Sequence, residues 1–581
     1  MHCINTTTSQ SDHLVQILPP KEEGFGRLSF YLLASLLAVF VYFYGLGSDH
    51  LATNGDELVY AQITRATAQS GHLLPLQSPI ARLQNTKPPL LFWQGIISTQ
   101  GAKNWSLANL RYPNVVYTLL TALMLFSLGK KLSGTWESAF LAFLIYLSFF
   151  GIYRYGRCFL TSGPEIFWCF LPFFVLLYWP QLFNYWNIIP VFGSIIGLGL
   201  LYKSFALVAP VSLGLAWWYL HTREYQFSVW LKRDTGKILL LVLIALGVFS
   251  LWFVFDPYPQ AVFNNFIVKE NLGKFDAGAG NYLLNFFWGN SSIWRNVIAY
   301  PFNAGLLAPA TIALVILGYL SFRQKNLSNS DKLLWIWVIT VFVFFSFPNQ
   351  RDERYLLLGM PALALLLALH WNRIPRWIMA ITLLAVAVIT LGLGGLSLIL
   401  QHDLALETWS FYHYSIGYWF LLALTVGLML AGLLKPHLTA SLACPGTILL
   451  YLCYALFLAP FDGPLGRFDQ VAQEAVLDKK IWVPTNFNAR EESYRFLLPE
   501  AKALIPYDYN ENITISEMQA KVPRFIISLP LTNTSGENLQ GAHILGRRLN
   551  LIDRFNAKET RAILSGKIAK YLFHQDLLIE R

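Results

Sequence analysis

Residues 377–400 read WIMAITLLAVAVITLGLGGLSLIL and contain no charged side chain. An apolar run of more than about 18 residues crosses the hydrocarbon core of a bilayer as a helix. Similar blocks, each bounded by polar or basic residues, recur through the chain before Phe461, and together they predict a polytopic α-helical membrane protein with about 13 transmembrane helices. The other blocks are Leu28–Tyr44, Tyr112–Gly129, Ser138–Phe150, Ile166–Tyr178, Ile188–Leu201, Ala206–Tyr219, Ile238–Phe255, Val297–Phe322, Leu333–Phe347, Tyr355–Leu369, Tyr414–Leu434 and Ala443–Leu458.

The composition agrees with a membrane environment. Only 13% of the 581 residues are charged, against about 25% in soluble domains, and 55% are hydrophobic. The net charge of +10 fits loops that face anionic lipid head groups. No run of basic residues is interleaved with aromatic residues, so we expect no nucleic-acid partner. The five cysteines show no metal-ligand spacing, which argues against a zinc site or a disulfide framework.

The pattern divides the chain into three segments. Residues 1–27 are expected to form a cytoplasmic N-terminal segment, residues 28–460 a transmembrane domain, and residues 461–581 a soluble α/β domain. Two long loops, 45–111 and 256–296, interrupt the transmembrane domain, and long loops in compact proteins are often functional. In the tail we expect strands at Lys480–Pro484 and Arg524–Leu529, and helices at Phe468–Leu477 and Glu491–Leu498.

Orientation follows from the basic residues of the short loops. With the N-terminus in the cytoplasm, nearly every inner loop is basic, in agreement with the positive-inside rule. An odd number of spans then places both long loops and the tail on the outer side of the membrane. The inner basic residues are Lys130, Lys131, Arg223, Lys232, Arg233, Lys237, Arg323, Lys325, Lys332, Arg373, Arg376 and Lys435.

The first candidate motif is Gly55-Asp56-Glu57, which follows the first span. An acidic pair at a membrane surface can act as a general base or hold a cation. The alternative is that Asp56 only caps a helix. We expect an amphipathic helix from Glu57 to about Ser70 that lies on the membrane surface, with Gly71 just after its end.

The second motif is Asn85-Thr86-Lys87-Pro88-Pro89-Leu90. The two prolines hold the backbone extended and orient Lys87, which suits a phosphate at the level of the head groups. The alternative is a lysine that snorkels from an apolar surface to water.

Four further basic residues lie near the outer ends of spans. These are Lys203, Lys274, Arg351 and Arg354. Each one alone is more often an interfacial anchor than a ligand. All four fall on the same side as Lys87, so together they predict a pocket for an anionic, membrane-borne substrate around the acidic pair.

The order of these motifs resembles that of polyprenyl-phosphate-dependent glycosyltransferases with the membrane GT-C fold. The most similar members are the lipid A aminoarabinose transferases and their protein O-mannosyltransferase relatives. The resemblance runs from about Leu28 to Leu369. It rests on the acidic pair after the first span and on Thr-Lys-Pro-Pro-Leu at 86–90 further along the first outer loop. It implies a GT-C-like membrane domain followed by an outer α/β domain.

The resemblance also implies roles for single residues. Asp56 matches an acidic residue at the catalytic centre. Lys87, Lys274 and Tyr355 match residues that contact the donor phosphate, and Lys203 resembles the lysine of a related motif.

Three motifs depart from the family pattern. Lys203 stands in Tyr-Lys-Ser, where the family motif reads Thr-Lys-Gly. Thr86 stands where the family motif has glutamate. Ser162 stands where family members usually carry a second aspartate. We predict that Glu165, about one helical turn further on, supplies this second carboxylate. The alternative is that Glu165 only places a favourable charge at a helix N-terminus. Some relatives use a divalent cation and some do not, so a metal stays open.

The implied function is transfer of a sugar from a polyprenyl-phosphate carrier, such as undecaprenyl phosphate, to a lipid A-like or other acceptor. The reaction is expected to invert the anomeric carbon, at the periplasmic face of a bacterial inner membrane. One alternative is a transporter or flippase of a lipid-linked anion, and another is a non-catalytic relative. Transporters often carry charges near the midplane and an internal repeat, and the sequence displays neither.

Overall fold

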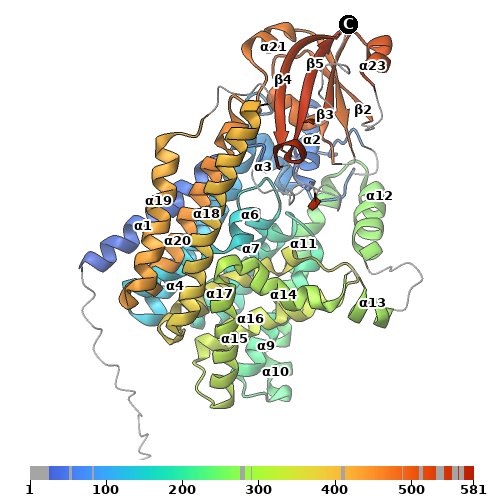
Figure 1. Ribbon diagram of the computed structural model, residues 1–581. Coiled ribbons are helices and arrows are strands. Elements are labelled where there is room, and N and C mark those ends of the chain that lie inside the picture. Colours follow the sequence, from blue (N-terminus) through green and yellow to red (C-terminus); the bar gives the residue numbers. More distant parts are fainter. Residues whose placement is uncertain are drawn as a thin grey trace, which may run out of the picture.

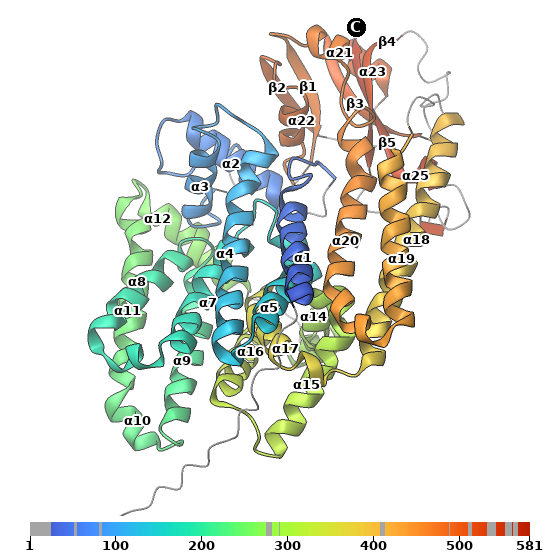
Figure 2. The same ribbon diagram turned by 90° about the vertical axis from the view of Figure 1, so that its left-hand side faces the viewer.

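The computed structural model describes residues 25–50, 55–80, 84–274, 282–289, 291–406, 413–486, 488–508, 514–531, 542–551, 560–561 and 568–581. A bundle of helices carries a small sheet domain at one end (Figure 1, Figure 2). The helices up to the sheet domain are α1 (Phe25–Phe43), α2 (Asp56–Gln69), α3 (Leu90–Ser98), α4 (Leu107–Ser133), α5 (Trp136–Ser148), α6 (Phe150–Tyr155), α7 (Ser162–Tyr178), α8 (Ile189–Leu200), α9 (Val208–Thr222), α10 (Phe227–Arg233), α11 (Thr235–Phe255), α12 (Pro259–Val262), α13 (Tyr282–Trp288), α14 (Ile293–Ala304), α15 (Ala308–Arg323), α16 (Asn329–Ser346), α17 (Met360–Leu369), α18 (Arg376–Leu406), α19 (Ile416–Leu434) and α20 (Pro436–Asp462).

The helical part is that of a polytopic membrane protein. Within the described ranges, nine helical stretches are long and apolar enough to cross a membrane. Three shorter apolar helices, Trp136–Ser148, Ser162–Tyr178 and Trp186–Leu200, accompany them. The exact number of thirteen stays a prediction. The nine stretches are Gly26–Phe43, Leu107–Ser133, Phe205–Thr222, Thr235–Phe255, Leu284–Arg323, Asn329–Ser346, Arg376–Leu404, Ile416–Leu434 and Pro436–Asp462.

Local sequence signals set the ends of the long helix α4. The Ser106 side chain accepts a hydrogen bond from the backbone N–H of Asn109 and so caps the start of the helix. The helix ends at Gly134, whose φ of 76° is the left-handed conformation that glycine adopts without strain. Gly129 lies against the backbone of Ser138, where an added Cβ would come within 2.7 Å of the carbonyl oxygen. The glycine therefore allows α4 and α5 to pack closely.

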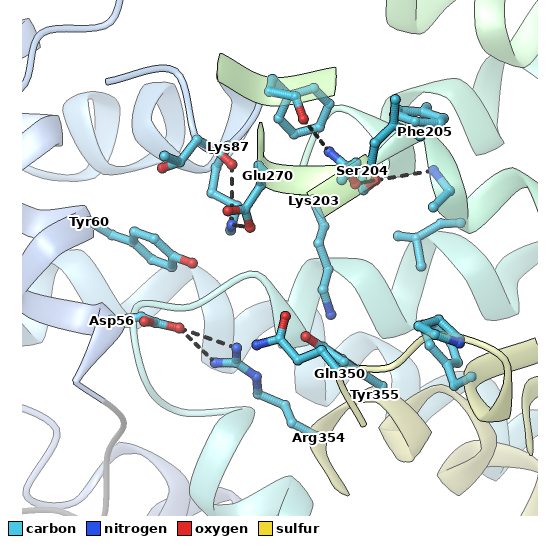
Figure 3. A pocket seen from close by; sticks show the side chains of 18 of the residues that line it. Asp56, Tyr60, Lys87, Lys203, Ser204, Phe205, Glu270, Gln350, Arg354 and Tyr355 are labelled. Carbon is cyan, nitrogen blue, oxygen red and sulfur yellow. Dashed lines mark hydrogen bonds and ion pairs between the residues drawn. The ribbon is translucent and has the colours of Figure 1, made fainter. Parts of the chain in front are cut away.

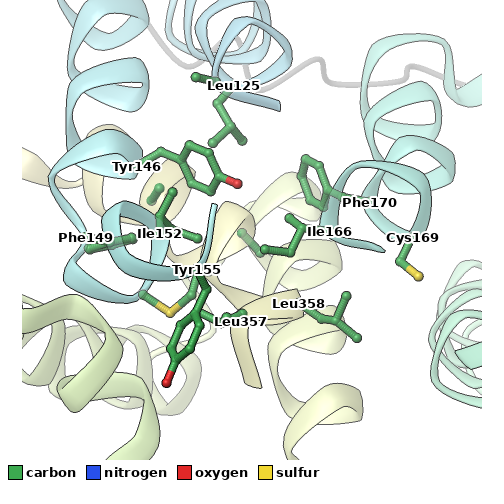
Figure 4. Close-up of a cluster of buried hydrophobic side chains, with 14 of the residues drawn as sticks. Leu125, Tyr146, Phe149, Ile152, Tyr155, Ile166, Cys169, Phe170, Leu357 and Leu358 are labelled. Atoms are coloured by element: carbon green, nitrogen blue, oxygen red, sulfur yellow. The ribbon is translucent and has the colours of Figure 1, made fainter. Parts of the chain in front are cut away.

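The centre of the bundle is a cluster of fully buried apolar side chains (Figure 4). Tyr146 comes from α5 and Ile152 from α6, and both meet Ile166 and Phe170 of α7 in this cluster. Leu357 of the short helix η8 (Glu353–Gly359) also lies there. Because protein interiors are close-packed, this cluster fixes the start of α7 relative to η8, and both elements border the site described below.

The C-terminal domain is a five-stranded mixed sheet with the strand order β2-β1-β3-β5-β4. β1 pairs in parallel with β2 and β3, whereas β5 pairs antiparallel with β3 and β4. Its elements are α21 (Gln470–Ala475), β1 (Lys480–Thr485), α22 (Glu491–Leu497), β2 (Ala503–Asp508), α23 (Ile515–Lys521), β3 (Arg524–Pro530), β4 (His543–Leu551), α25 (Ile568–Leu572) and β5 (Phe573–Glu580).

A buried cluster of charged side chains lies between strands β4 and β5 and helix α22. Arg548 Nε donates to Asp576 Oδ2 at 2.9 Å, and the Tyr494 hydroxyl donates to the same oxygen at 3.1 Å. Arg490 Nη2 lies 3.7 Å from Asp576 Oδ1. Burial opposes ionisation of Asp576, but Arg548, Arg490 and a hydrogen bond with Ser528 together lower the pKa of this carboxyl below its ordinary value. Asp576 is therefore a charged residue of the domain core.

The prediction of a C-terminal α/β domain is confirmed, and all four elements expected in it are present. The expected strands correspond to β1 and β3, and the expected helices to α21 and α22. β2, β4, β5, α23 and α25 were not predicted.

The prediction that the helix after Asp56 lies on the membrane surface is wrong. The helix exists as α2, and Gly71 follows it with φ of 76°. However, Val59, Ala61 and Ile63 are all buried. The helix contacts α3 and also α22, which belongs to the C-terminal domain. The three buried apolar side chains belong to the main apolar cluster of the helical bundle, whereas the C-terminal domain binds the polar side chains Gln62 and Arg65. The N-cap residue is Gly55, and Asp56 is the first helical residue.

Candidate active site

A cavity of about 790 Å³ lies where the helical bundle meets the C-terminal domain. Charged and aromatic side chains from separate segments line it (Figure 3). They include Asp56 and Tyr60 of α2, Lys87 before α3, Lys203 after α8, Glu270, and Arg354 with Tyr355 of η8.

Backbone and side-chain hydrogen bonds tie these segments together. The Leu90 N–H donates to the carbonyl of Leu201 at 3.2 Å, which joins the Lys87 segment to the Lys203 segment. The Ser204 hydroxyl donates to Asn271 Oδ1 at 2.7 Å. Asn271 ends η5 (Phe263–Asn271), a π-helical segment of the kind frequent at functional sites. The cations of the cavity are therefore held at fixed positions relative to one another.

Asp56 and Arg354 form one charged pair of the cavity. Both terminal nitrogens of Arg354 donate to Asp56 Oδ2 at 3.2 Å. The Asp56 side chain remains 45% exposed, so it is accessible from the cavity. Burial opposes the charge of Arg354, but the neighbouring Tyr60 and Asp56 raise its pKa above the ordinary value. Arg354 is therefore a permanent cation beside Asp56.

Lys87 and Glu270 form a second pair. The Lys87 ammonium contacts the Glu270 carboxylate and also donates to the carbonyl of Thr86 at 3.2 Å. Figure 3 shows both pairs bordering the same space, into which the Lys203 side chain points. Glu270 is a cavity residue that sequence reasoning missed, although it directly precedes the Asn271-Leu272-Gly273-Lys274 stretch of the second long loop.

Glu165, which does not line the cavity, binds the Lys203 ammonium. This ammonium donates to both carboxylate oxygens of Glu165, each at 2.8 Å, and lies 4.9 Å from the ring centroid of Tyr355. Tyr355 in turn stacks on Phe345, with the centroids 5.4 Å apart. Glu165 is buried in the first turn of α7. The structure thus connects Glu165 to the site through Lys203.

Two other predicted site residues also lie outside the cavity lining. Glu57 is buried and binds Arg111 through two hydrogen bonds of 2.7 and 2.8 Å. The N–H of Phe159 donates to the same carboxylate at 2.7 Å. Arg351 is buried and donates to the carbonyls of Ser346 and Ser291 at 2.9 and 2.6 Å. Glu57 thus joins α2 to α4 and to the loop before α7. Arg351 joins the loop before η8 to the end of α16 and to Ser291, before α14.

Lys274 ends the short helix η6 (Leu272–Lys274) at the margin of the described range. Leu272 of the same turn lines the cavity. The Lys274 side chain lies outside what the structure describes, so its predicted contact with the donor phosphate stays a prediction.

The C-terminal domain contributes Asn488 to the cavity. The Asn488 side chain lies directly against Gly55, the residue before Asp56. Nothing in the sequence signals this contact, because it joins positions more than 400 residues apart that only the docking of the domain brings together.

The donor set of the cavity does not resemble a metal centre. Among the described residues, no three His, Cys, Asp or Glu side chains come together in a way that could hold a metal ion. Asp56 and Glu270 each face a cation, Arg354 and Lys87 respectively. The arrangement is instead suited to binding an anion with Lys87 and Lys203, and to placing a carboxylate at the edge of that anion site.

Comparison with known proteins places this geometry on a known fold. The crystal structure of ArnT from Cupriavidus metallidurans in the apo state matches with a TM-score of 0.59 over 95% of this chain and 98% of that chain, at 13% identity. The chain has the GT-C fold. The structure of the same ArnT bound to undecaprenyl phosphate matches with a TM-score of 0.58 over 96% of this chain and 98% of that chain, at 14% identity.

The curated proteins that this chain resembles in sequence are distant relatives. An undecaprenyl phosphate-alpha-4-amino-4-deoxy-L-arabinose arabinosyl transferase 2 of Proteus mirabilis is 24% identical over 355 residues, 58% of each chain. An arabinosyl transferase of Aeromonas hydrophila with the same donor in its name is 26% identical over 350 residues, 57% of this chain and 58% of its own. The chain thus spans 58% of the length of these relatives. No protein-family model matches it.

Proposed function

We propose that the protein is a membrane glycosyltransferase that moves a sugar from a polyprenyl-phosphate carrier to an acceptor with a lipid A-like headgroup. The cavity carries this proposal, because it joins Asp56 to three cations, Lys87, Lys203 and Arg354, on a GT-C fold. The names of the two curated relatives, and the ArnT structure bound to undecaprenyl phosphate, support this class of donor.

In the proposed reaction, Lys87 and Lys203 bind the phosphate of the donor. As the bond between the anomeric carbon and the phosphate oxygen breaks, its electron pair goes to that oxygen and the negative charge of the phosphate grows. Fixed cations beside this oxygen stabilise the transition state more than the ground state. Tyr355 lines the same cavity, with its ring 4.9 Å from the Lys203 ammonium, and its hydroxyl donates a hydrogen bond to the phosphate in this proposal.

Asp56 is the proposed base. It takes the proton of the acceptor O–H while the acceptor oxygen forms the new bond to the anomeric carbon from the face opposite the phosphate, which inverts that carbon. Arg354 holds Asp56 Oδ2 and keeps the carboxylate aimed at the cavity. A positioned base of this kind contributes roughly a hundredfold to ten-thousandfold in rate.

The remaining predicted residues have supporting roles in this proposal. Glu165 positions Lys203, and Glu57 and Arg351 stabilise the loops that frame the cavity. Ser162 is buried and does not line the cavity, so we propose no reaction step for it. No step is routed through a metal.

The proposed orientation places the cavity and the C-terminal domain in the periplasm. α10, which carries the basic residues Lys232 and Arg233, lies at the end of the bundle opposite the sheet (Figure 1, Figure 2). Basic residues concentrate on the cytoplasmic side of membrane proteins. A reporter that fluoresces only in the cytoplasm should therefore stay dark when fused after Arg581, and a bright fusion would reverse the orientation.

The direct test is turnover by the purified protein in lipid nanodiscs. The probes are undecaprenyl phosphate carrying 4-amino-4-deoxy-L-arabinose as donor and lipid A as acceptor, with release of undecaprenyl phosphate as the readout. We expect turnover by the wild type and a loss of roughly a hundredfold or more in Asp56→Asn. The matched control is Asp478→Asn, the same chemical change at an exposed position outside the cavity. Equal rates for Asp56→Asn and the wild type would exclude Asp56 as the base.

A further inference from the structure

We infer that Asn488, in the C-terminal domain, determines acceptor specificity by binding a hydroxyl of the acceptor headgroup beside Asp56. This inference rests on the proposed glycosyl transfer and extends it. It assigns the outer domain a direct part in the site, as the element that recognises the acceptor.

The position of Asn488 supports this assignment. Asn488 lies in the loop between β1 and α22 and lines the cavity together with Asp56. Its backbone N–H donates to Asn486 Oδ1 at 2.9 Å, which folds the loop back on itself. The next residue, Ala489, is fully buried and belongs to the large apolar cluster of the helical bundle. At Ala489 the loop therefore packs against the helical part of the chain.

The Asn488 side chain packs closely against Gly55, the residue before Asp56. Gly55 has φ of −56° and ψ of −18°, a right-handed conformation open to every residue. However, a Cβ at Gly55 would lie 2.7 Å from Asn488 Nδ2 and 2.9 Å from its Cγ. The backbone conformation does not require glycine here, but any side chain at this position would have to displace the Asn488 amide. The motif before Asp56 is thus matched to a side chain of the C-terminal domain.

The docking of α22 on α2 holds this side chain in place. Arg65 donates to both carboxylate oxygens of Glu492, at 2.7 and 2.8 Å, and Glu492 is fully buried. Gln62 Nε2 donates to Glu491 Oε1 at 2.5 Å. Bidentate arginine–carboxylate pairs fix geometry as well as contributing energy. Because α2 begins with Asp56, the same contacts set the distance between Asn488 and the proposed base.

The chemistry of the amide indicates what it binds. An asparagine side chain has two N–H donors and one carbonyl acceptor and carries no charge. The anion-binding cations Lys87 and Lys203 come from other segments of the cavity, so Asn488 adds nothing to phosphate binding by charge. A sugar hydroxyl, which both donates and accepts, complements the amide. Asn488 therefore fits the hydroxyl-bearing headgroup of a glycolipid acceptor.

The test separates acceptor from donor kinetics in nanodiscs, with lipid A and undecaprenyl phosphate-linked aminoarabinose as the probes. Asn488→Ala should raise the KM for lipid A roughly threefold to tenfold, as expected for one lost hydrogen bond, and leave the KM for the donor unchanged. The dissociation constant of lipid A, measured without donor, should rise by the same factor. The control Asn104→Ala, an exposed asparagine of the first outer loop outside the cavity, should leave both values unchanged.

Gly55→Ala provides a second, independent variant. The new methyl group displaces only the end of the Asn488 side chain, so the thermal stability should hold while the KM for lipid A rises. In the double variant Gly55→Ala with Asn488→Ala, the methyl group has no amide to displace, and the effect should equal that of Asn488→Ala alone. Additive effects would show that Gly55 acts by another route and would overturn the inference.

The outcomes distinguish this inference from the proposed function. If lipid A binds Asn488→Ala as tightly as the wild type while Asp56→Asn is inactive, the inference fails and the transferase proposal stands. If Asp56→Asn is fully active, the transferase proposal fails at the base.

Discussion

The substitution Glu165→Gln separates a positioning role from a catalytic one. Both carboxylate oxygens of Glu165 accept hydrogen bonds from Lys203, each at 2.8 Å, and the two side chains are 3% and 14% exposed. A hydrogen bond to a charged group is worth about 1.5–3 kcal/mol, or roughly tenfold to a hundredfold in affinity. Glutamine keeps one acceptor oxygen and loses the charge, so we expect roughly a tenfold fall in kcat/KM for the donor.

The magnitude alone does not distinguish the two roles, but a double variant does. If Glu165 acts only through Lys203, then Lys203→Ala removes everything that Glu165 contributes. Adding Glu165→Gln to Lys203→Ala should then change donor kcat/KM by less than about twofold. The assay is steady-state release of undecaprenyl phosphate with varied donor, and thermal unfolding confirms that each variant is folded.

Two results would refute this reasoning. Full activity in Glu165→Gln would mean that Lys203 does not need its partner. A double variant far less active than Lys203→Ala would mean that Glu165 takes part in the reaction independently, as the second carboxylate that the sequence suggested.

Four further substitutions test other parts of the structure. Lys87→Ala should weaken donor use roughly tenfold to a hundredfold. Glu270→Gln should lower the donor KM, because the phosphate then no longer competes with a carboxylate for Lys87. Unchanged donor KM values in both variants would show that the phosphate does not bind at Lys87. Arg65→Ala leaves the buried Glu492 without its bidentate partner. Amide hydrogen exchange in residues 480–498 should therefore become faster, while the membrane helices keep their protection. Unchanged exchange in 480–498 would mean that this pair does not hold the domain in place. Asp576→Asn should destabilise the C-terminal domain at pH 7, and the difference from wild type should shrink as the pH falls below the ordinary value of 3.8, because the folded-state pKa is depressed; a pH-independent difference in thermal unfolding would contradict this.

The sequence was sufficient for the broad architecture because its signals were local. Long apolar runs such as 377–400 determine membrane helices wherever the chain places them. β1 and β3 were found because each contains a short apolar run that is buried in the sheet. β2 is mostly half-buried or exposed, and β4 carries Arg547, Arg548 and an irregular register at Gly546, so neither contains the buried apolar run that marks β1 and β3. Their pairing with neighbouring strands, which sequence periodicity does not encode, decides their structure.

The candidate site was predictable only where chemistry and motif order agreed. Asp56, Lys87, Lys203, Arg354 and Tyr355 all line one cavity, as a pocket for an anionic substrate requires. Glu57, Glu165 and Arg351 lie outside it because their side chains are buried and bind other groups of the protein.

Glu57 illustrates this limit. Its partner Arg111 lies 54 positions away, and Glu165 and Lys203 are 38 positions apart. A carboxylate next to a catalytic candidate is indistinguishable in sequence from one that holds an arginine in the core. Asn488 was missed for the same reason, since the docking of a separate domain creates its environment.

The most direct measurement of the central claim follows the sugar itself. Purified protein in nanodiscs is given undecaprenyl phosphate carrying radiolabelled aminoarabinose together with lipid A, and the lipids are separated after the reaction. The proposed function predicts that the label moves to lipid A in the wild type and stays on the carrier in Asp56→Asn. If the label stays on the carrier with the wild type, and the carrier instead crosses the bilayer of sealed vesicles that contain the protein, then the protein is a flippase and the account is contradicted.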